Sequence, residues 1–357
     1  MKSCNYNGES CWEATVVPGY AIGKVLLNGY SEMELPTPLV TEAGTLNNIN
    51  LTVKDPDDDF RFDFASKTFY VHSADGLKTW AQAALGDSSI NCILTSDITM
   101  PEDMKWTPIG TSERPYVGTF DGGNNTISGL TVDASDGDYV GLIGYLDEDG
   151  EIRNLTLNDV QIAGSQKVGA VAGENHGTIT ACSVTGGSVS GSDYVGVVAG
   201  ENNGFISACI STGSVSGDSY VGGVTGANKT EGYMVACCRT TGSVTGNTTV
   251  GGVTGSNEGY VTACYSIGTI SGSSAGAVAG GNTNGSITAC YWSDYDGSGI
   301  GDSGTGEALI VDGMNLTWSK AMQNMNEAID EWNYDHWNSE CNYIWGTINP
   351  PYLQYNQ

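Results

Sequence analysis

The sequence predicts an all-β fold built around a single-stranded, right-handed parallel β-helix, or solenoid, with helical and aromatic caps. Three observations predict this fold class. A unit of 26 to 28 residues repeats along the chain, glycine supplies 51 of the 357 residues, and each apolar run within a unit is short. Isolated helices need roughly 12–15 residues to be stable, so short runs punctuated by glycine indicate strands joined by tight turns.

The composition narrows the classes of function. The formal net charge is −28, from 41 acidic and 13 basic residues. Binding to nucleic acid or to an anionic membrane needs clustered lysine and arginine, so we expect neither partner. No apolar run approaches the ~20 residues of a membrane-spanning helix, so we expect no transmembrane segment.

The chain divides into four predicted regions, which differ in repeat content and in aromatic residues. All eight tryptophans lie outside the interval 107–291, which suggests that large side chains close the ends of the solenoid. In chain order the regions are an N-terminal β segment or linker, read as the remnant of another module (1–66), an N-terminal cap with a short helix (67–115), the solenoid repeats (116–295) and a C-terminal cap with a helix (296–357).

Helical spacing of apolar residues marks one element in each cap. In the N-terminal cap it covers 76–85, with Asp75 as a candidate N-cap. In the C-terminal cap it covers 316–329, with Thr317 as a candidate cap. We expect the first helix to cover the first coil and the aromatic tail beyond the second to pack over the last coil.

Within the array, each unit holds three short apolar runs, which predicts three strands a coil and about six to seven coils in total. Equivalent residues of successive coils then stack at ~4.8 Å and form ladders. We interpret the recurring asparagines as stacked amides that bond from coil to coil, and the recurring cysteines as small buried hydrophobes. The two ladders are Asn175, Asn202, Asn228, Asn257 and Asn282, and Cys182, Cys209, Cys237, Cys264 and Cys290.

One segment of the unit conflicts with an ideal strand. In Thr178–Cys182, alternation would place Ile179 and Ala181 on one face and Cys182 on the other. Because both Ile179 and Cys182 are expected in the core, we predict a bulge or bend near Ala181.

Outward side chains carry the binding hypothesis. Tyr139, Tyr194 and Tyr220 are the candidate binding residues, with Tyr145 beside them in the sequence. If Tyr194 and Tyr220 point outward one coil apart, they favour a binding surface, whereas burial of both favours a plain spacer.

A metal site is a second hypothesis. Asp294 and Asp296 could supply oxygen ligands to calcium, as could the acidic run Asp55–Asp59. Neither stretch follows an EF-hand loop, and solvated acidic turns are the competing interpretation. No other cofactor is expected, and no cysteine or histidine spacing is typical of a zinc site.

An enzyme on the solenoid flank is the alternative reading. Candidate carboxylates are the run 147–149, facing Arg153, with Asp121, Asp136 and Asp138 in neighbouring turns. A glycoside hydrolase needs two carboxylates roughly 5–9.5 Å apart, and a polysaccharide lyase needs carboxylates with calcium and a basic residue. The three histidines do not form the His-Glu-x-x-His motif of metallopeptidases, so the sequence favours a non-catalytic role.

The unit Val-Gly-Gly-Val-Thr-Gly-Ser-Asn-Glu-Gly-Tyr-Val-Thr-Ala-Cys at 250–264 resembles the GLUG repeat of secreted and surface proteins of gut Bacteroidetes. The resemblance covers about 68–290, with departures at Gly169, Gly196 and Gly276, where the second glycine of the motif is replaced. Some proteins with this repeat are described as immunoglobulin A peptidases.

The resemblance implies an extracellular or cell-surface location. Because Met1–Asn5 lacks the apolar core of a signal peptide, we expect that a signal peptide has been removed. The predicted function is a non-catalytic scaffold for adhesion or for binding a host glycan or glycoprotein. The alternatives are a polysaccharide lyase or glycoside hydrolase on a β-helix flank, and an accessory repeat domain of a secreted peptidase.

Overall fold

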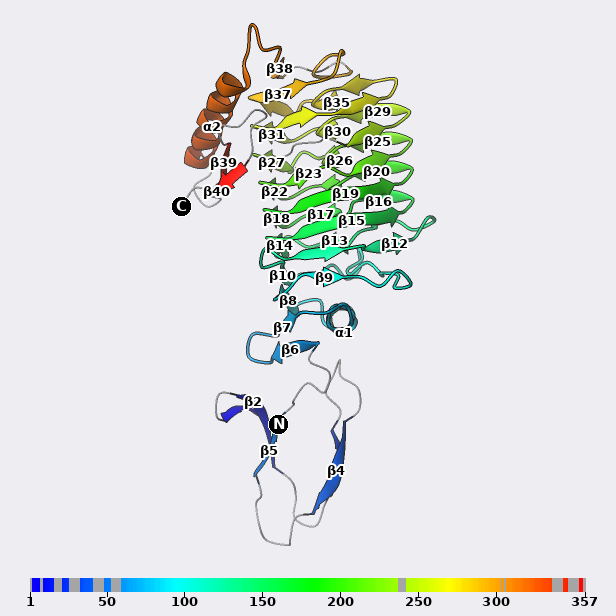
Figure 1. Cartoon of the computed structure of the whole chain (residues 1–357), viewed down its shortest axis with the longest axis vertical. Coiled ribbons are helices and arrows are strands. Elements are labelled where there is room, and N and C mark those ends of the chain that lie inside the picture. The colour runs from blue at the N-terminus through cyan, green and yellow to red at the C-terminus, as the bar shows by residue number, and fades with distance from the viewer. Residues whose placement is uncertain are drawn as a thin grey trace.

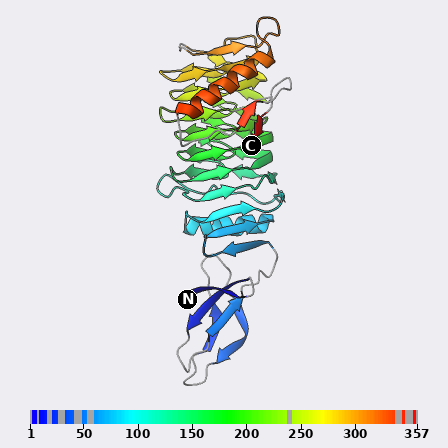
Figure 2. The same cartoon turned by 90° about the vertical axis from the view of Figure 1, so that its left-hand side faces the viewer.

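The structure is a computed structural model that describes backbone and side chains for 59–236, 242–302, 304 and 306–333. Cys237, a member of the predicted cysteine ladder, lies outside the described residues. Figures 1 and 2 show a long stack of β coils with one helix below the stack and a second along its side. The parallel β-solenoid predicted from the sequence is confirmed.

Four sheets run along the stack, each built from equivalent strands of successive coils apart from the antiparallel strand Phe60–Asp63 that begins the first of them. A full coil of the repeats therefore holds four strands, and the prediction of three strands a coil is wrong. We name them the long, second, outgoing and returning sheets. The long sheet holds β6 (Phe60–Asp63), β7 (Thr68–Val71), β8 (Asn91–Leu94), β10 (Thr119–Asp121), β14 (Glu151–Arg153), β18 (Thr178–Thr180), β22 (Phe205–Ser207), β27 (Tyr233–Val235), β31 (Tyr260–Thr262) and β36 (Ser286–Thr288). The second sheet holds β9 (Ile98–Thr99), β11 (Thr126–Ser128), β12 (Thr131–Asp133), β15 (Thr156–Ala163), β19 (Ser183–Ser190), β23 (Ile210–Ser211), β24 (Ser214–Ser216), β28 (Ser243–Thr245) and β33 (Thr269–Ser271). The outgoing sheet holds β16 (Gln166–Val168), β20 (Asp193–Gly196), β25 (Ser219–Gly222), β29 (Thr248–Gly251) and β34 (Ala275–Gly276). The returning sheet holds β13 (Ile143–Leu146), β17 (Ala172–Asn175), β21 (Ala199–Asn202), β26 (Thr225–Asn228), β30 (Thr254–Asn257) and β35 (Ala279–Asn282).

Smaller sheets lie at the two ends of the chain. A three-stranded parallel sheet of β32, β37 and β38 ends the stack. The strands of this sheet are β32 (Tyr265–Ile267), β37 (Cys290–Ser293) and β38 (Ala308–Ile310). The strands near the two chain termini are β1 (Lys2–Tyr6), β2 (Glu9–Thr15), β3 (Ala21–Val25), β4 (Met33–Val40), β5 (Asn48–Thr52), β39 (Tyr343–Trp345) and β40 (Leu353–Tyr355).

The solenoid is longer than the repeat pattern predicts. In the long sheet, β7 pairs in parallel with β8, and β8 pairs in parallel with β10, so coils already form upstream of Tyr116, where we expected the array to begin. The parallel strands from β7 to β36 give about eight turns rather than six or seven. These first coils use Phe69, Cys92 and Leu94 as inward residues, without the glycine pattern that marks the later repeats.

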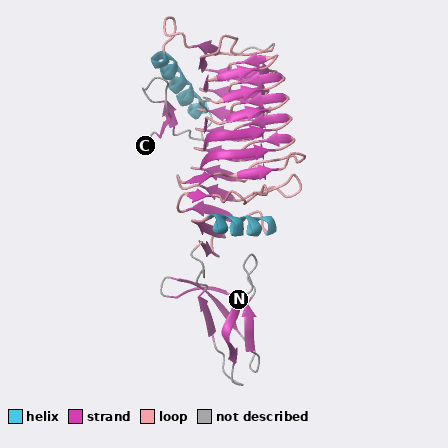
Figure 3. Ribbon diagram, turned by 45° about the vertical axis from the view of Figure 1, so that its right-hand side comes forward, coloured by secondary structure: helices cyan, strands magenta, loops and turns pink. Residues whose placement is uncertain are grey.

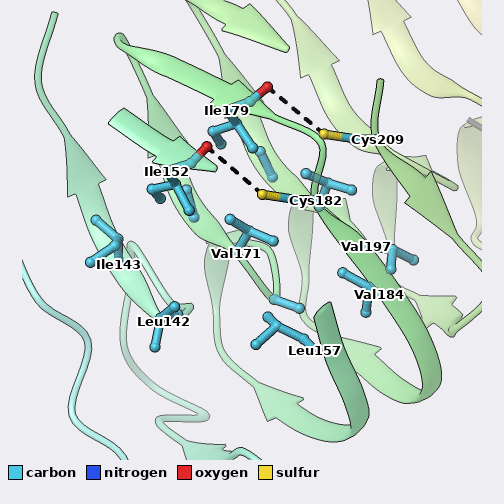
Figure 4. Packing of buried hydrophobic residues seen from close by; sticks show 14 of the residues in the cluster. Leu142, Ile143, Ile152, Leu157, Val171, Ile179, Cys182, Val184, Val197 and Cys209 are labelled. Carbon is cyan, nitrogen blue, oxygen red and sulfur yellow. Dashed lines mark hydrogen bonds between the residues drawn. The ribbon is translucent and has the colours of Figure 1, made fainter. Parts of the chain in front are cut away.

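A tight bend between the long and second sheets resolves the conflict in the sequence. Ala181 has a φ of 54°, in the left-handed region, which L-residues occupy at a cost of about 1–2 kcal/mol. The bend lets Ile179 and Cys182 both reach the core, where both are fully buried (Figure 4). The thiol of Cys182 then lies 3.8 Å from the carbonyl oxygen of Ile152 in the preceding coil. The same left-handed alanine recurs at Ala208, Ala236, Ala263 and Ala289.

The asparagines at the ends of the returning strands stack along the solenoid and are buried. Each of the first four donates its side-chain amide to the Oδ1 of the next one, and Asn282 donates to the carbonyl oxygen of Gly285. The Nδ2···Oδ1 distances are 2.7 Å from Asn175 to Asn202 and 2.8 Å for the steps onward to Asn228, Asn257 and Asn282. Because buried amides are costly unless they are bonded, this chain of bonds holds neighbouring coils in one register.

Helix α1 (Ala74–Gly86) closes the N-terminal end of the stack (Figure 3). Its side chains Leu77 and Trp80 are fully buried, and the Trp80 ring lies 5.0 Å from the ring of Phe120 in a coil above. The N-cap is Ser73, whose side chain accepts from the backbone N–H of Gly76, so the prediction of Asp75 as the cap is wrong. Asp75 lies inside the first turn, where its negative charge interacts favourably with the positive end of the helix dipole.

Helix α2 (Trp318–Asp335) follows Thr317, whose hydroxyl accepts from the backbone N–H of Lys320 at 3.4 Å, as predicted for a cap. The helix lies along the side of the stack (Figure 2). The aromatic tail beyond it, which we expected to pack over the last coil, lies outside the described residues. Among the described residues no helix is long and apolar enough to cross a membrane.

An outward row of aromatic side chains on the long sheet explains where α2 docks. Phe205, Tyr233 and Tyr260, which we name the flank column, are paired in register on successive strands. Trp332 of α2 stacks on Phe205, with ring centroids 5.3 Å apart. The apolar face of the helix therefore packs on this flank of the solenoid.

Candidate functional site

The predicted binding residues lie in one column at the start of the outgoing sheet. Each directly precedes a buried valine, and these valines are in register from coil to coil. Lys167 occupies the same place between Tyr139 and Tyr194. We name the set the corner column: Tyr139, Lys167, Tyr194, Tyr220 and Thr249.

All five members have left-handed backbones, with φ between 53° and 60°. This geometry is uncommon for bulky residues and is maintained here by close packing. The glycine of a later returning strand lies against the backbone of each column residue. A Cβ on Gly173 would approach the carbonyl carbon of Tyr139 to 2.5 Å, and one on Gly226 that of Tyr194 to 2.4 Å. The repeated glycine of the motif is therefore what allows the column to form.

The two central tyrosines stack face to face. The ring centroids of Tyr194 and Tyr220 are 4.8 Å apart with the planes 3° from parallel, which matches the spacing between adjacent strands. Both side chains are half-buried, so neither the fully outward nor the fully buried arrangement applies. The two rings cover each other's facing sides, and the rest of each side chain is in partial contact with solvent.

An ion-pair network lies beside the column on the returning sheet. Lys167 Nζ is 2.5 Å from Glu174 Oε2 and 3.1 Å from Glu201 Oε1. The side chains of Glu174 and Glu201 are only 7% and 10% exposed, which is rare for carboxylates unless they are paired. Burial on its own would lower the pKa of Lys167, but the hydrogen bond to Glu174 and the charge of Glu201 outweigh it, so its pKa is raised.

A histidine extends this network. His176 Nε2 lies 2.7 Å from Glu174 Oε1 and 2.8 Å from the hydroxyl of Tyr145. The hydrogen bond to Glu174 raises the pKa of His176 above its ordinary value, against the opposing effect of burial. Burial would raise the pKa of Glu174, but the hydrogen bonds from His176 and Lys167 lower it.

Lysines connect the network to the aromatic surface. Lys167 Nζ lies 5.2 Å from the ring centre of Tyr139, and Lys229 Nζ lies 5.2 Å from that of Tyr194. Lys229 is also 3.9 Å from Glu201 Oε2. Both distances to the rings are within the range of cation–π attraction. The corner thus combines aromatic rings, paired cations and buried carboxylates within a few coils.

The tyrosines of this site were predicted from the sequence, but its charged residues were not. The signal was present, because Glu174 and Glu201 occupy equivalent places in adjacent units and Lys167, His176 and Lys229 are among the few basic side chains of the repeats. Since Glu174 has a lowered pKa, it stays ionised, unlike the proton-donating acid of a glycosidase, whose pKa must be raised.

Two of the carboxylates proposed for catalysis, Asp121 and Asp138, have other partners. Arg153 does not face the run 147–149. Its Nε lies 2.8 Å from Asp121 Oδ2 and its Nη1 2.7 Å from Glu151 Oε2. Neighbouring strands place Asp121, Glu151 and Arg153 on the same outward face, which accounts for the pairing. Asp138 accepts a hydrogen bond from the backbone of the next coil.

The predicted calcium ligands Asp294 and Asp296 lie in one exposed turn. Asp294 has a left-handed backbone with a φ of 61°, and its Oδ2 is 3.2 Å from the hydroxyl of Ser293. Within the described part of the chain, no group of three or more His, Cys, Asp or Glu residues is placed to hold a metal ion. Of the run Asp55–Asp59, only Asp59 is among the described residues.

Comparison with known proteins gives a fold relationship and two short sequence matches. No protein-family profile matches the chain. A 74-residue segment is 43% identical to halomucin of Haloquadratum walsbyi, covering 20% of this chain and 1% of halomucin. An 82-residue segment is 37% identical to a "Putative Gly-rich membrane protein" of Evansella cellulosilytica, covering 22% of this chain and 10% of that protein. The chain therefore matches only a small part of either relative.

A solved structure shares the fold over most of the chain. It is a crystal structure from Bacteroides ovatus described as a putative immunoglobulin A1 protease. The TM-score is 0.60 at 21% sequence identity, over 81% of this chain and 93% of that one. At this level of identity the likeness establishes a common β-solenoid architecture.

Proposed function

We propose that this chain is a non-catalytic extracellular or cell-surface scaffold that binds a host glycan or glycoprotein at the corner column. The observation that carries the proposal is the stacked, half-buried pair Tyr194 and Tyr220 with Lys229 over one ring. Flat aromatic faces with polar groups at their rims suit ligands that have both apolar faces and hydroxyl groups.

The surroundings of the pair support binding rather than catalysis. Glu174 and Glu201 are already paired with Lys167, so their charges hold the corner rigid and do not attack a substrate. Pre-organised side chains favour binding because less conformational freedom is lost when a ligand arrives. The resemblance of the repeats to GLUG units supports the proposed extracellular location.

An accessory repeat domain of a secreted peptidase is the second candidate. It is favoured by the description of the Bacteroides ovatus structure as a putative immunoglobulin A1 protease. In that role the solenoid would position a partner domain against its substrate, and the corner column would contact the glycoprotein being cleaved.

The experiment is a screen of the whole chain on immobilised glycans and host glycoproteins, with mass spectrometry of every sample to detect cleavage. We expect retention of a defined ligand without product. Tyr194→Ala and Tyr220→Ala are expected to weaken retention about tenfold each, as for central aromatic contacts. The matched control is Tyr70→Ala, because Tyr70 also lies under a cation, with Arg61 3.9 Å from its ring centre, but is outside the column.

Each outcome of the screen separates the candidates. Equal loss in Tyr70→Ala, or no loss in the column variants, would contradict the proposed surface. Shortened sugars or cleaved protein would replace the proposal with an enzyme. Repeating the screen in EDTA tests the predicted calcium site at Asp294 and Asp296, since bound calcium that shapes the ligand surface would make retention sensitive to the chelator.

A further inference from the structure

A second ring-binding position lies where the flank column ends. The rings of Tyr233 and Tyr260 are stacked, with centroids 4.8 Å apart and planes 4° from parallel. In the next coil the residue in register with Tyr260 is Ser286. The column of rings therefore stops, and among the described residues the in-register place of a further ring holds only the small hydroxyl side chain of Ser286.

The end of this column opens into a groove of about 570 Å³, a volume typical of small-molecule sites. Tyr260 is 44% exposed, although it belongs to an otherwise covered row. The groove is lined by Thr230, Glu258, Gly259, Tyr260, Asn284, Gly285, Ser286, Ile287, Gly306 and Glu307.

The lining defines the chemistry of a ligand. Glu258 and Glu307 supply carboxylates, Asn284 an amide, and Thr230 and Ser286 hydroxyls. None of these described lining residues is lysine or arginine, so the groove is unsuited to sulfated or uronic acid sugars. Hydrogen-bonding groups surround one flat aromatic face, which suits a neutral ring with hydroxyl groups at its rim.

We propose that this groove binds one neutral pyranose unit of a glycan, with the face of the sugar ring on Tyr260 and its hydroxyls toward Glu258, Asn284 and Glu307. The sugar takes the place of the missing ring in the stack. Helix α2 covers the other end of the flank column through Trp332 on Phe205, which leaves Tyr260 as the exposed end. The groove shares no lining residue with the corner column, although Lys229, which lies over the ring of Tyr194, also pairs with Glu258 at 3.6 Å.

The test uses the whole chain and saturation-transfer NMR with methyl β-D-glucopyranoside, methyl β-D-galactopyranoside and N-acetylglucosamine. A single ring in an open groove is expected to bind on the order of millimolar. We expect transfer to protons of one sugar face. Tyr260→Ala is expected to weaken binding about tenfold and Tyr260→Phe to preserve it, because stacking needs the ring and not its hydroxyl.

Ser286→Tyr is the decisive variant. It continues the column by one ring and fills the slot while leaving Tyr260 in place, so binding is expected to be lost even if Tyr260→Ala fails to fold. Tyr194→Ala is expected to have no effect. Transfer that persists in Ser286→Tyr, no transfer from any of the three sugars, or transfer from N-acetyltyrosinamide in their place would overturn the inference. Loss confined to Tyr194→Ala would move the sugar to the corner column and support the proposed function instead.

Discussion

The corner column and the flank column are stacks of rings in the same solenoid, and they differ in what covers them. Tyr194 and Tyr220 stand beside paired lysines and glutamates and remain half-buried. Phe205 and Tyr233 also lie in register along the stack, but the apolar face of α2 covers them. A ladder of aromatic residues in a solenoid is therefore neither a binding site nor a docking site by itself, because its neighbours decide which.

Gly226→Ala is the strongest way to break the corner column. The new methyl group would lie 2.4 Å from the carbonyl carbon of Tyr194, and backbone cannot move aside as a flexible side chain can. We expect a loss of about 3 kcal/mol in the free energy of unfolding, measured by chemical denaturation. The matched control is Gly281→Ala, since the equivalent residue two coils earlier is Ala227 and the nearest atom is a methyl group 3.5 Å away. Equal losses in both variants would show that close packing at the column is not the cause.

Trp332→Ala tests the cover of the flank column. Trp332 is 8% exposed, and its removal takes away the contact with Phe205. We expect a loss of about 3 kcal/mol, together with an increase in the fluorescence of a dye that binds apolar surface. Glu331→Ala, at an exposed neighbouring position on the same helix, is expected to change neither. Unfolding curves that coincide for all three proteins would show that the helix does not depend on this contact.

The smallest expected effect is a pH dependence at the corner. The hydrogen bond to Glu174 raises the pKa of His176, so the stabilisation is fully present below the ordinary histidine value. It is lost as the pH rises through the raised value, and amounts to about 1 kcal/mol or less. NMR titration of the imidazole, assigned with His176→Asn, measures it. In Glu174→Gln the pKa is expected to fall. An unchanged titration would mean that Glu174 does not set it.

The repeat pattern predicted the architecture because each unit carries the same residues at the positions that contact the neighbouring coils. The alternation in Thr178–Cys182 even indicated the bend at Ala181. We did not predict the first coils because Phe69 and Cys92 fill the core there without the glycines that mark the later repeats. We did not predict the network around Lys167 because its members lie on three strands that are separate in the sequence. Only the stacking of coils brings these strands together.

The side position of α2 escaped for a related reason. Helical spacing identifies an apolar face but not the surface that receives it. The receiving surface is visible only when Phe205, Tyr233 and Tyr260 are aligned as one outward row.

The glycine that lies against the backbone of another coil makes the whole repeat the unit by which the solenoid can be lengthened. Because those contacts reach only nearby coils, duplication of a whole unit reproduces every one of them and lengthens the molecule by about 4.8 Å. Insertion of a single residue within a strand beside this glycine would place a side chain where only glycine fits, whereas the turn after the returning strand differs in length between units and accommodates repeats of 26 to 28 residues. Recombination between whole repeats would therefore change the length of the solenoid in steps of one coil. The surface residues of each unit would be copied with it.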